Sequence, residues 1–211
     1  MYAPAAFRWD DRAAALAFAR ARGFAALITV VDGAPMVSHL PLLVDADGAR
    51  LRGHVARANP HAAHLDGLDH LVVFAGPDAY VSPDWYETEE DVPTWNYLVA
   101  HVRGRGRVYG EDADIDRQLR DLSDLHEAQR HDLATGIFWK LDKLDARAVE
   151  RMRRAIVAFE IDIEAVEGKA KLSQNKKPEV AARVAAKLEV APGERPRAVA
   201  ALMAERLAGR R

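Results

Sequence analysis

Runs of alternating apolar and polar residues predict extended segments along this chain of 211 residues. A strand with one buried and one solvated face has a period of two, and several segments here show that pattern. Asp32-Gly33, between the first two segments, is a strong signal for a two-residue hairpin. Gly76-Pro77 is expected to interrupt one extended stretch. The expected strands cover residues 24–31, 36–44, 51–56, 71–75, 79–82, 95–109 and 156–166.

Helical segments lie between and after these strands. Asp11 precedes a run rich in Ala and Leu that stops at Gly23, and such a run is bracketed as a helix by an Asp N-cap and a Gly past its end. Asn59-Pro60 marks the start of a short helix that is expected to end near Gly67. The remaining helices are expected at residues 112–129, 146–153, 178–189 and 196–208.

The connections between strands decide the expected fold class. Short hairpin connections require antiparallel pairing, because a parallel pair needs a long crossover. About six antiparallel strands with few helices predict a mainly β protein, a closed or split barrel with flanking helices and a C-terminal helical segment. We expect a barrel domain over residues 1–170 and a C-terminal loop with helices over residues 171–211, packed on the barrel or on a dimer partner.

Composition narrows the function classes a little. The net charge is −2 and there is no cysteine, which excludes disulfides, thiolate nucleophiles and zinc-finger sites. Residues 150–211 carry 14 Lys and Arg against 9 Asp and Glu, which fits an anionic ligand or, more simply, a solvated helical face. Without a membrane-length apolar run or a signal-peptide pattern, a cytoplasmic location is expected.

The segment from Gly53 to Pro60 joins a strand to the start of a helix. Unpaired amides in the first turn of a helix, together with its dipole, favour an anion. Arg57 stands beside that turn, and its planar fork of donors suits phosphate. The alternative is a helix capped by Asn59 with an exposed arginine.

Two further segments combine aromatic rings, amides, a hydroxyl and cations. Around Trp95 the period of two places Trp95 and Tyr97 on one face of the strand and Asn96 on the other. An aromatic, amide-rich element can pack on a flat ring, and a Lys/Ser/Gln/Asn/Lys run can hold an attached phosphate. These residues therefore suggest a planar phosphorylated ligand, although the aromatics also suit a core or a dimer contact. The segments are Val92-Pro93-Thr94-Trp95-Asn96-Tyr97 and Lys171-Leu172-Ser173-Gln174-Asn175-Lys176.

Other polar clusters carry weaker signals. His61 and His64 have the helical spacing of a metal clamp, but no third ligand has a diagnostic spacing, so we expect no metal site. No nucleophile elbow announces a catalytic set, and we assign no catalytic residue. The acidic loop with Glu87, Glu89, Glu90 and Asp91 is expected to stay solvated, as is the strand face of Arg103, Arg105 and Arg107.

Six blocks, in order along the chain, resemble the PaiB family, which is described as FMN-binding negative transcriptional regulators within the flavin-binding split-barrel group. They are Met1-Tyr2-x-Pro4, His39-Leu40-Pro41, Gly53-His54-Val55-Ala56-Arg57-Ala58-Asn59-Pro60, Val73-Phe74-x-Gly76-Pro77-x-Ala79-Tyr80-Val81-Ser82-Pro83-x-Trp85-Tyr86, and the two segments quoted above.

The resemblance implies a homodimeric split barrel that binds FMN noncovalently at the subunit interface. It implies that His54, Arg57 and Asn59 lie where split barrels hold the FMN phosphate. Thr94, Trp95 and Asn96 are the expected contacts to the flavin ring or the dimer seam. From the C-terminal side, the expected contacts to the phosphate or flavin edge are Lys171, Ser173, Gln174, Asn175 and Lys176.

Three other functions stay open at this point. The same fold group includes flavin-dependent oxidoreductases acting on small substrates, and some of its members bind haem. The third is a pure DNA-binding module, although the final two helices look like packing helices rather than a helix-turn-helix.

Overall fold

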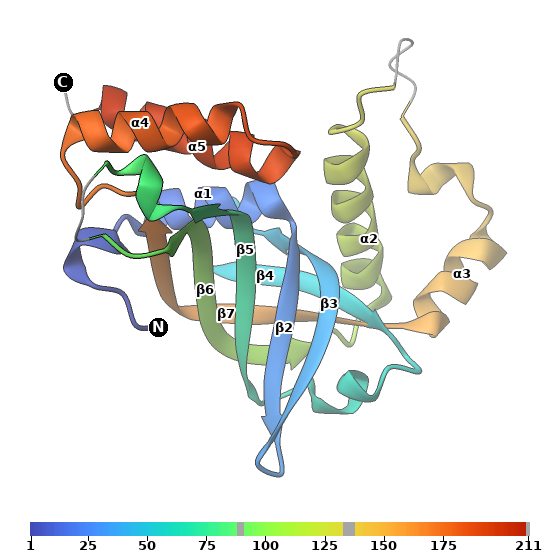
Figure 1. The fold of residues 1–211 in the computed structure, drawn as a ribbon. Helices are drawn as coiled ribbons and strands as arrows, with labels where there is room; N and C mark the ends of the chain where they lie inside the picture. Colours follow the sequence, from blue (N-terminus) through green and yellow to red (C-terminus); the bar gives the residue numbers. More distant parts are fainter. Residues whose placement is uncertain (88–90, 133–137, 210–211) are drawn as a thin grey trace. The chain divides into compact units, whose positions relative to one another are not determined.

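A computed structural model describes residues 1–87, 91–132 and 138–209 of the chain. Its strands form one seven-stranded sheet in the order β1-β7-β4-β3-β2-β5-β6, and β6 pairs in addition with β7 (Figure 1). Six of the strands therefore close into a barrel, as the sequence predicts. The strands are β1 (Arg8–Trp9), β2 (Phe24–Val31), β3 (Ala34–Val44), β4 (Arg50–Ala56), β5 (Asp69–Val81), β6 (Thr94–Val108) and β7 (Ile156–Lys171).

Contacts divide the chain into two compact units. The first unit comprises Met1–Ala15, Ala75–His101 and Glu167–Arg211, and the second comprises Leu16–Phe74 and Val102–Val166. Strands β5, β6 and β7 contribute residues to both units. The expected boundary at residue 170 stays a prediction, because compactness does not test which segments fold independently.

The second unit contains the hairpin and the closure of the barrel. Asp32 and Gly33 both have positive φ, 51° and 81°, as a two-residue turn of the predicted type requires. Gly104 in β6 allows the closure, because a Cβ atom there would lie 1.9 Å from the carbonyl oxygen of Asp162 in β7. The interior is fully apolar at its centre, with Leu27, Leu42, Leu51, Phe159 and Ile161 all below 1% exposed.

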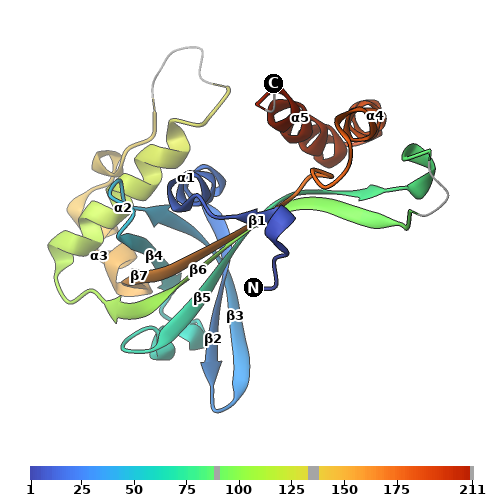
Figure 2. The same ribbon diagram turned by 90° about the vertical axis from the view of Figure 1, so that its left-hand side faces the viewer.

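The first unit contains two packed C-terminal helices, α4 (Pro178–Glu189) and α5 (Glu194–Ala208), which lie side by side in both ribbon views (Figure 2). Gly193 separates them with φ of 97°, a conformation that favours glycine. Their buried faces are formed by Ala181, Val184, Leu188, Val199, Ala200 and Met203.

Three other helices are α1 (Arg12–Arg22), α2 (Asp112–Glu127) and α3 (Ala146–Ala155), close to the predicted bounds. In the part of the chain that the structure describes, no helix has both the length and the apolar character to cross a membrane.

Three details of the prediction were wrong. The strand β5 runs through Gly76-Pro77 without a break. The register of β5 with β2 covers residues 70–73, so the missing N–H of Pro77 removes no bond of that ladder. The helix predicted after Asn59 is a 3₁₀ turn, η2 (Pro60–His64). The two-residue strand β1 was missed, since two residues carry no period.

Candidate functional site

A polar cavity of about 200 Å³ lies in the first unit. It is formed where β6 begins and β7 ends, together with the loop that follows β7. We call it the lysine pocket. Most of the predicted ligand contacts from the two polar segments line it. Its lining residues are Phe7, Tyr86, Asp91, Val92, Thr94, Asn96, Lys171, Ser173, Asn175 and Lys176.

Lys171, the last residue of β7, has an unusual environment for a cation. Its Nζ donates a hydrogen bond to the hydroxyl of Thr94 and lies 5.7 Å from the centre of the Phe7 ring. Burial lowers the pKa of this ammonium group. Among the described residues no carboxylate forms an ion pair with it. A half-buried cation that faces a hydroxyl and a ring is suited to binding an anion.

The charge of Lys176, unlike that of Lys171, is balanced by a carboxylate. Its Nζ forms an ion pair with Asp91 and lies 4.7 Å from the centre of the Tyr86 ring. The side chains of Lys176 and Asp91 are 26% and 19% exposed. The expectation that Asp91 stays solvated was therefore wrong. Glu87 is 68% exposed and pairs with Arg183, whereas Glu89 and Glu90 lie outside the described residues.

Ser173 and Asn96 form the floor of the lysine pocket. Asn96 is fully buried, and its Nδ2 donates to the Ser173 hydroxyl at 2.9 Å. Ser173 has φ of 57°, a left-handed conformation that costs free energy for a residue with a Cβ atom and is found often at binding sites. Burial raises the pKa of Tyr86, and its hydrogen bond with Ser173 opposes that shift. The floor is thus buried and hydrogen-bonded.

Gln174 and Trp95 do not line this cavity. Gln174 stabilises the loop after β7 through two hydrogen bonds. Its Oε1 accepts from the Leu172 amide at 2.7 Å and its Nε2 donates to the carbonyl of Ala170. Trp95 is 51% exposed and meets Tyr80 edge to face at 6.0 Å between ring centres. As the strand period predicts, Trp95 and Asn96 lie on opposite faces.

His54, Arg57 and Asn59 belong to the second unit. Arg57 is exposed and donates to the carbonyl oxygens of Arg154 and Ile156, both at 2.7 Å. Asn59 caps η2 by accepting from the His61 amide. Burial lowers the pKa of His54, whose buried Nδ1 has no hydrogen-bond partner among the described residues. The role of these three residues in ligand binding stays a prediction.

Two histidines of the second unit, His61 and His70, form a buried chain of hydrogen bonds with Thr29 and Ser38, which we call the histidine relay. Thr29 Oγ1 lies 2.7 Å from His61 Nε2 and 2.6 Å from His70 Nδ1. His61 Nδ1 lies 2.9 Å from the Ser38 hydroxyl, and His70 Nε2 lies 3.0 Å from the carbonyl of Leu65. Both rings are buried, with 0% and 2% exposure.

The relay fixes the direction of each bond. His70 Nε2 must carry a proton to donate to a carbonyl, so its Nδ1 accepts from the Thr29 hydroxyl. The Thr29 oxygen then accepts from His61 Nε2–H, which leaves His61 Nδ1 to accept from Ser38. Both nitrogens of His61 are therefore occupied by the protein. Within the described ranges, no three side chains are grouped to hold a metal ion.

The second unit has a larger, more apolar hollow of about 560 Å³. It is lined by Ile28, Val30, Leu68, Asp69, His70, Leu71, Arg103, Gly104, Glu164 and Ala165. Sequence reasoning missed this hollow, because its residues come from four strands and the residue before β5 and share no motif. Arg105 and Arg107, from the same strand face as Arg103, are exposed and pair with Asp69 and Glu160.

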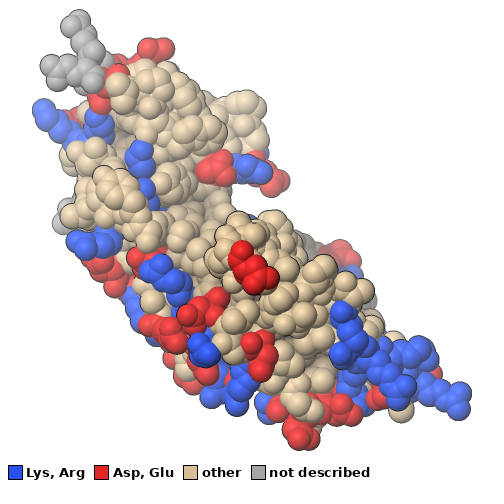
Figure 3. Space-filling view, turned by 90° about the horizontal axis from the view of Figure 1, so that it is seen from below, with Lys and Arg blue, Asp and Glu red and all other residues tan. Residues whose placement is uncertain are grey.

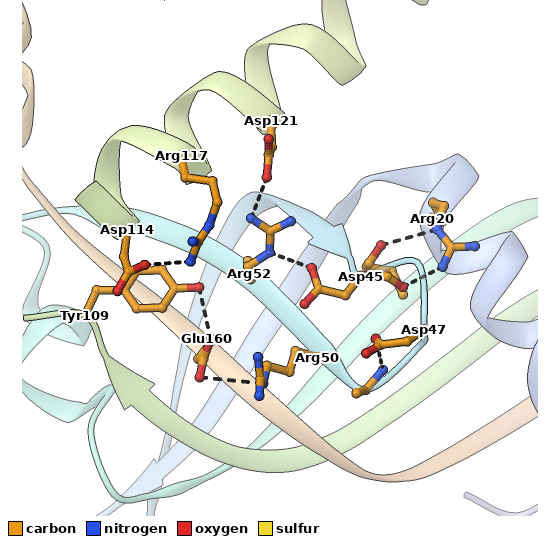
Figure 4. A network of polar contacts seen from close by, with 12 residues as sticks. Arg20, Asp45, Asp47, Arg50, Arg52, Tyr109, Asp114, Arg117, Asp121 and Glu160 are labelled. Carbon is orange, nitrogen blue, oxygen red and sulfur yellow. Dashed lines mark hydrogen bonds and ion pairs between the residues drawn. The ribbon is translucent and has the colours of Figure 1, made fainter. Parts of the chain in front are cut away.

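A dense set of charges in the second unit, the arginine network, was also not predicted (Figure 4). Arg52 donates to Asp45 at 2.5 Å and to Asp121 at 2.7 Å. Arg20 donates to the carbonyl oxygens of Val44 and Asp45. A buried carboxylate, Glu160, accepts from the Tyr109 hydroxyl at 3.1 Å and pairs with Arg50 at 3.7 Å. Every guanidinium named here faces an acceptor of the chain itself.

Comparisons with known proteins bear on the family and the fold. The family model described as "Putative FMN-binding domain" matches residues 1–165. The chain is 32% identical over 179 residues to the Bacillus subtilis protein named "Protease synthase and sporulation protein PAI 2". The aligned region covers 83% of each of the two chains.

Two solved structures share the fold at low identity. The flavocytochrome Anf3 from Azotobacter vinelandii matches with a TM-score of 0.58 and 16% identity, over 78% of this chain and 69% of that one. The FAD and heme binding protein from Mycobacterium smegmatis matches with a TM-score of 0.55 and 18% identity, over 77% and 71%. These likenesses confirm the predicted split-barrel class.

Proposed function

Because the chain belongs to the family described as putative FMN-binding domains, as its resemblance to the PaiB family predicts, we propose that it binds FMN and holds the phosphate in the lysine pocket. The observation that supports this assignment is Lys171, a half-buried ammonium group that faces Thr94 and the Phe7 ring. A ligand phosphate would supply the anion that this cation lacks among the described residues.

The size and chemistry of the lysine pocket fit one end of FMN. Its volume of about 200 Å³ is below the roughly 300–1,000 Å³ of pockets that enclose a whole ligand of this size. Lys171 and Lys176 offer charged donors, and Ser173 and Asn175 offer polar groups for a phosphate and its ribityl chain. Bound FMN would supply redox chemistry, while these residues bind and orient it.

Arg57 is a weaker candidate for the phosphate. Two of its donor nitrogens already bind backbone carbonyl oxygens at 2.7 Å. A phosphate at that position would have to compete with both bonds, whereas Lys171 gives up a single hydroxyl contact. Trp95 is 51% exposed and lies on the face of β6 opposite Asn96, so its predicted contact with the flavin ring stays a prediction.

The test is titration with FMN, followed by quenching of flavin fluorescence, of the wild type and the Lys171→Ala/Lys176→Ala double variant. Loss of two charge-assisted contacts should weaken binding by about 100-fold or more. Lys177→Ala is the matched control, because Lys177 is exposed, adjacent in sequence and absent from the pocket lining. Unchanged affinity in the double variant would refute the site.

A homodimer is the second part of the proposal, and the outer face of the sheet supports it. Cross-strand pairs share a face, so Ile28 lies beside Val37 and Val30 beside Pro35 on the outside of β2 and β3. Val30 and Val37 are 63% and 50% exposed. Figure 3 shows broad uncharged areas of surface between the charged side chains. An exposed apolar sheet face is typical of an association surface.

Light scattering coupled to size-exclusion chromatography tests the dimer. The wild type should elute with twice the chain mass, and Val37→Glu should shift the population toward the monomer. A wild-type monomer at micromolar concentration would exclude the dimer.

Regulation of transcription is the third part, supported by the 32% identity to a relative whose name refers to protease synthase and sporulation. We propose that flavin occupancy is the regulating signal. Fluorescence anisotropy with duplex DNA, with and without FMN at fixed salt, tests this idea, since DNA affinity depends steeply on salt. Bleaching of the bound flavin by NADH, without DNA binding, would favour an oxidoreductase instead.

A further inference from the structure

Among the described residues that line the lysine pocket, Asp91 contributes the one carboxylate. It forms an ion pair with Lys176, and both side chains are mostly buried. Lys176 is held from another side by the Tyr86 ring at 4.7 Å. The described lining therefore contains two lysines and one aspartate, an excess of one positive charge among these residues.

We propose that Asp91 is an exchangeable counter-ion, which the phosphate of the ligand displaces from Lys176. Asp91 thereby determines specificity, because a ligand must bring its own anionic group to replace the carboxylate. This inference rests on the proposed function, since it assumes that the phosphate of FMN enters the lysine pocket.

Charge balance is the first argument for exchange. A phosphate monoester carries a charge of about −1.5 to −2 at neutral pH. With Asp91 displaced, the two lysines neutralise that charge. With Asp91 still paired, the pocket would hold more negative than positive charge in a partly buried site, where repulsion between like charges is poorly screened.

Backbone position is the second argument. Asp91 lies three residues before β6, outside every helix and strand of the described chain, so its movement breaks no ladder hydrogen bond. Lys176 is anchored by its amide, which donates to the Ser173 carbonyl at 3.0 Å, and its ammonium group lies over Tyr86. The carboxylate, rather than the lysine, is therefore the group that moves away.

Selectivity between flavins follows from the same exchange. Riboflavin has the ring and the ribityl chain of FMN but no phosphate. It offers nothing to replace the carboxylate on Lys176, so the Asp91–Lys176 pair stays closed. Neutralising Asp91 should consequently help FMN and leave riboflavin nearly unaffected.

The experiment measures FMN and riboflavin affinities of the wild type, Asp91→Asn and Asp78→Asn. The matched control is Asp78→Asn, because Asp78 lies in the same unit and faces Arg195 at 3.5 Å, outside the lysine pocket. We expect Asp91→Asn to bind FMN about tenfold more tightly, with riboflavin within twofold of the wild type. We expect Asp78→Asn to change neither. The gain should disappear in Asp91→Asn/Lys176→Ala.

Each remaining outcome contradicts the inference. If the wild type binds FMN and Asp91→Asn binds it equally or more weakly, Asp91 is a ligand contact or a structural group. If Asp91→Asn binds both flavins more tightly, the change has opened the pocket without regard to charge. If no variant and no wild type binds FMN, the proposed function fails as well. Asp91→Ser serves as a second variant if Asp91→Asn does not fold.

Discussion

The arginine network and the lysine pocket both gather charged side chains, but they balance charge in different ways. In the arginine network, Arg52 lies between Asp45 and Asp121, and buried Glu160 lies among its own donors (Figure 4). In the lysine pocket, Lys171 faces a hydroxyl and an aromatic ring. A cluster that satisfies its own charges stabilises the fold, whereas a cluster with excess charge can bind a ligand.

The largest effect is expected in the histidine relay of the second unit, whose polar groups satisfy one another. Thr29→Val removes the hydroxyl that joins His61 to His70 and leaves two buried ring nitrogens without that partner. The free energy of unfolding should fall by about 3 kcal/mol, which is the usual cost of such losses. Urea unfolding measures it, and Thr29→Ser, which keeps the hydroxyl, is the control. A loss below about 0.5 kcal/mol would show that the relay is not structural.

Arg52→Ala should have the next largest effect on stability. It leaves Asp45 and Asp121 without their shared cation, and the Arg52 side chain is only 16% exposed. We expect a loss of about 2 kcal/mol in unfolding free energy, by the usual strength of hydrogen bonds between charged groups. FMN affinity should stay within twofold of the wild type. A large loss of affinity at unchanged stability would reverse the roles assigned to the two regions.

Acid should destabilise the protein through the histidine relay. Burial lowers the pKa of His61 and His70 below 6.5. The neighbouring His70 and then His64 lower the pKa of His61 further, whereas the hydrogen bond to the Leu65 carbonyl and then Asp69 oppose the shift at His70. The unfolded chain then binds protons more readily than the fold, so this stability is present above pH 6.5 and is lost as the pH falls below it. The slope approaches about 1.4 kcal/mol per pH unit for each histidine. Urea unfolding between pH 5 and 8 tests the sign, and a flat profile would contradict it.

Lys171→Met should have the smallest effect on stability. The substitution keeps an apolar stem beside Phe7 and removes a cation whose pKa is lowered by burial. The unfolding free energy should stay within about 0.5 kcal/mol, as for most changes that leave no buried group unpaired. FMN affinity should fall about tenfold, equivalent to about 1.4 kcal/mol. Combined measurements of both quantities separate a binding role from a structural one.

The fold was largely predictable because its signals are local and periodic. The bounds of β2 and of the Asp32-Gly33 turn follow from signals that lie only a few residues apart, namely residue type and the alternation of apolar and polar positions. The passage of β5 through Pro77 was not predictable, because it depends on which part of the strand has a partner.

The candidate site was predictable in part. Thr94, Asn96, Lys171, Ser173, Asn175 and Lys176 were chosen for residue type, and the structure brings them together at one cavity. The sequence alone did not show that Asp91 pairs with Lys176, since the two residues are 85 positions apart. Nor did it indicate Phe7, which β1 brings near the end of β7 through the pairing of Arg8 with Lys169. Such contacts arise from tertiary packing and leave no local pattern.

The ratio of the riboflavin and FMN dissociation constants in the wild-type protein tests the central claim most directly, because the two ligands differ only in the phosphate. If the lysine pocket holds that phosphate, FMN should bind about 100-fold or more tightly than riboflavin, from at least two charge-assisted contacts. The ratio should fall to near one in Lys171→Ala/Lys176→Ala. Equal affinities of the wild type for both flavins would contradict the account.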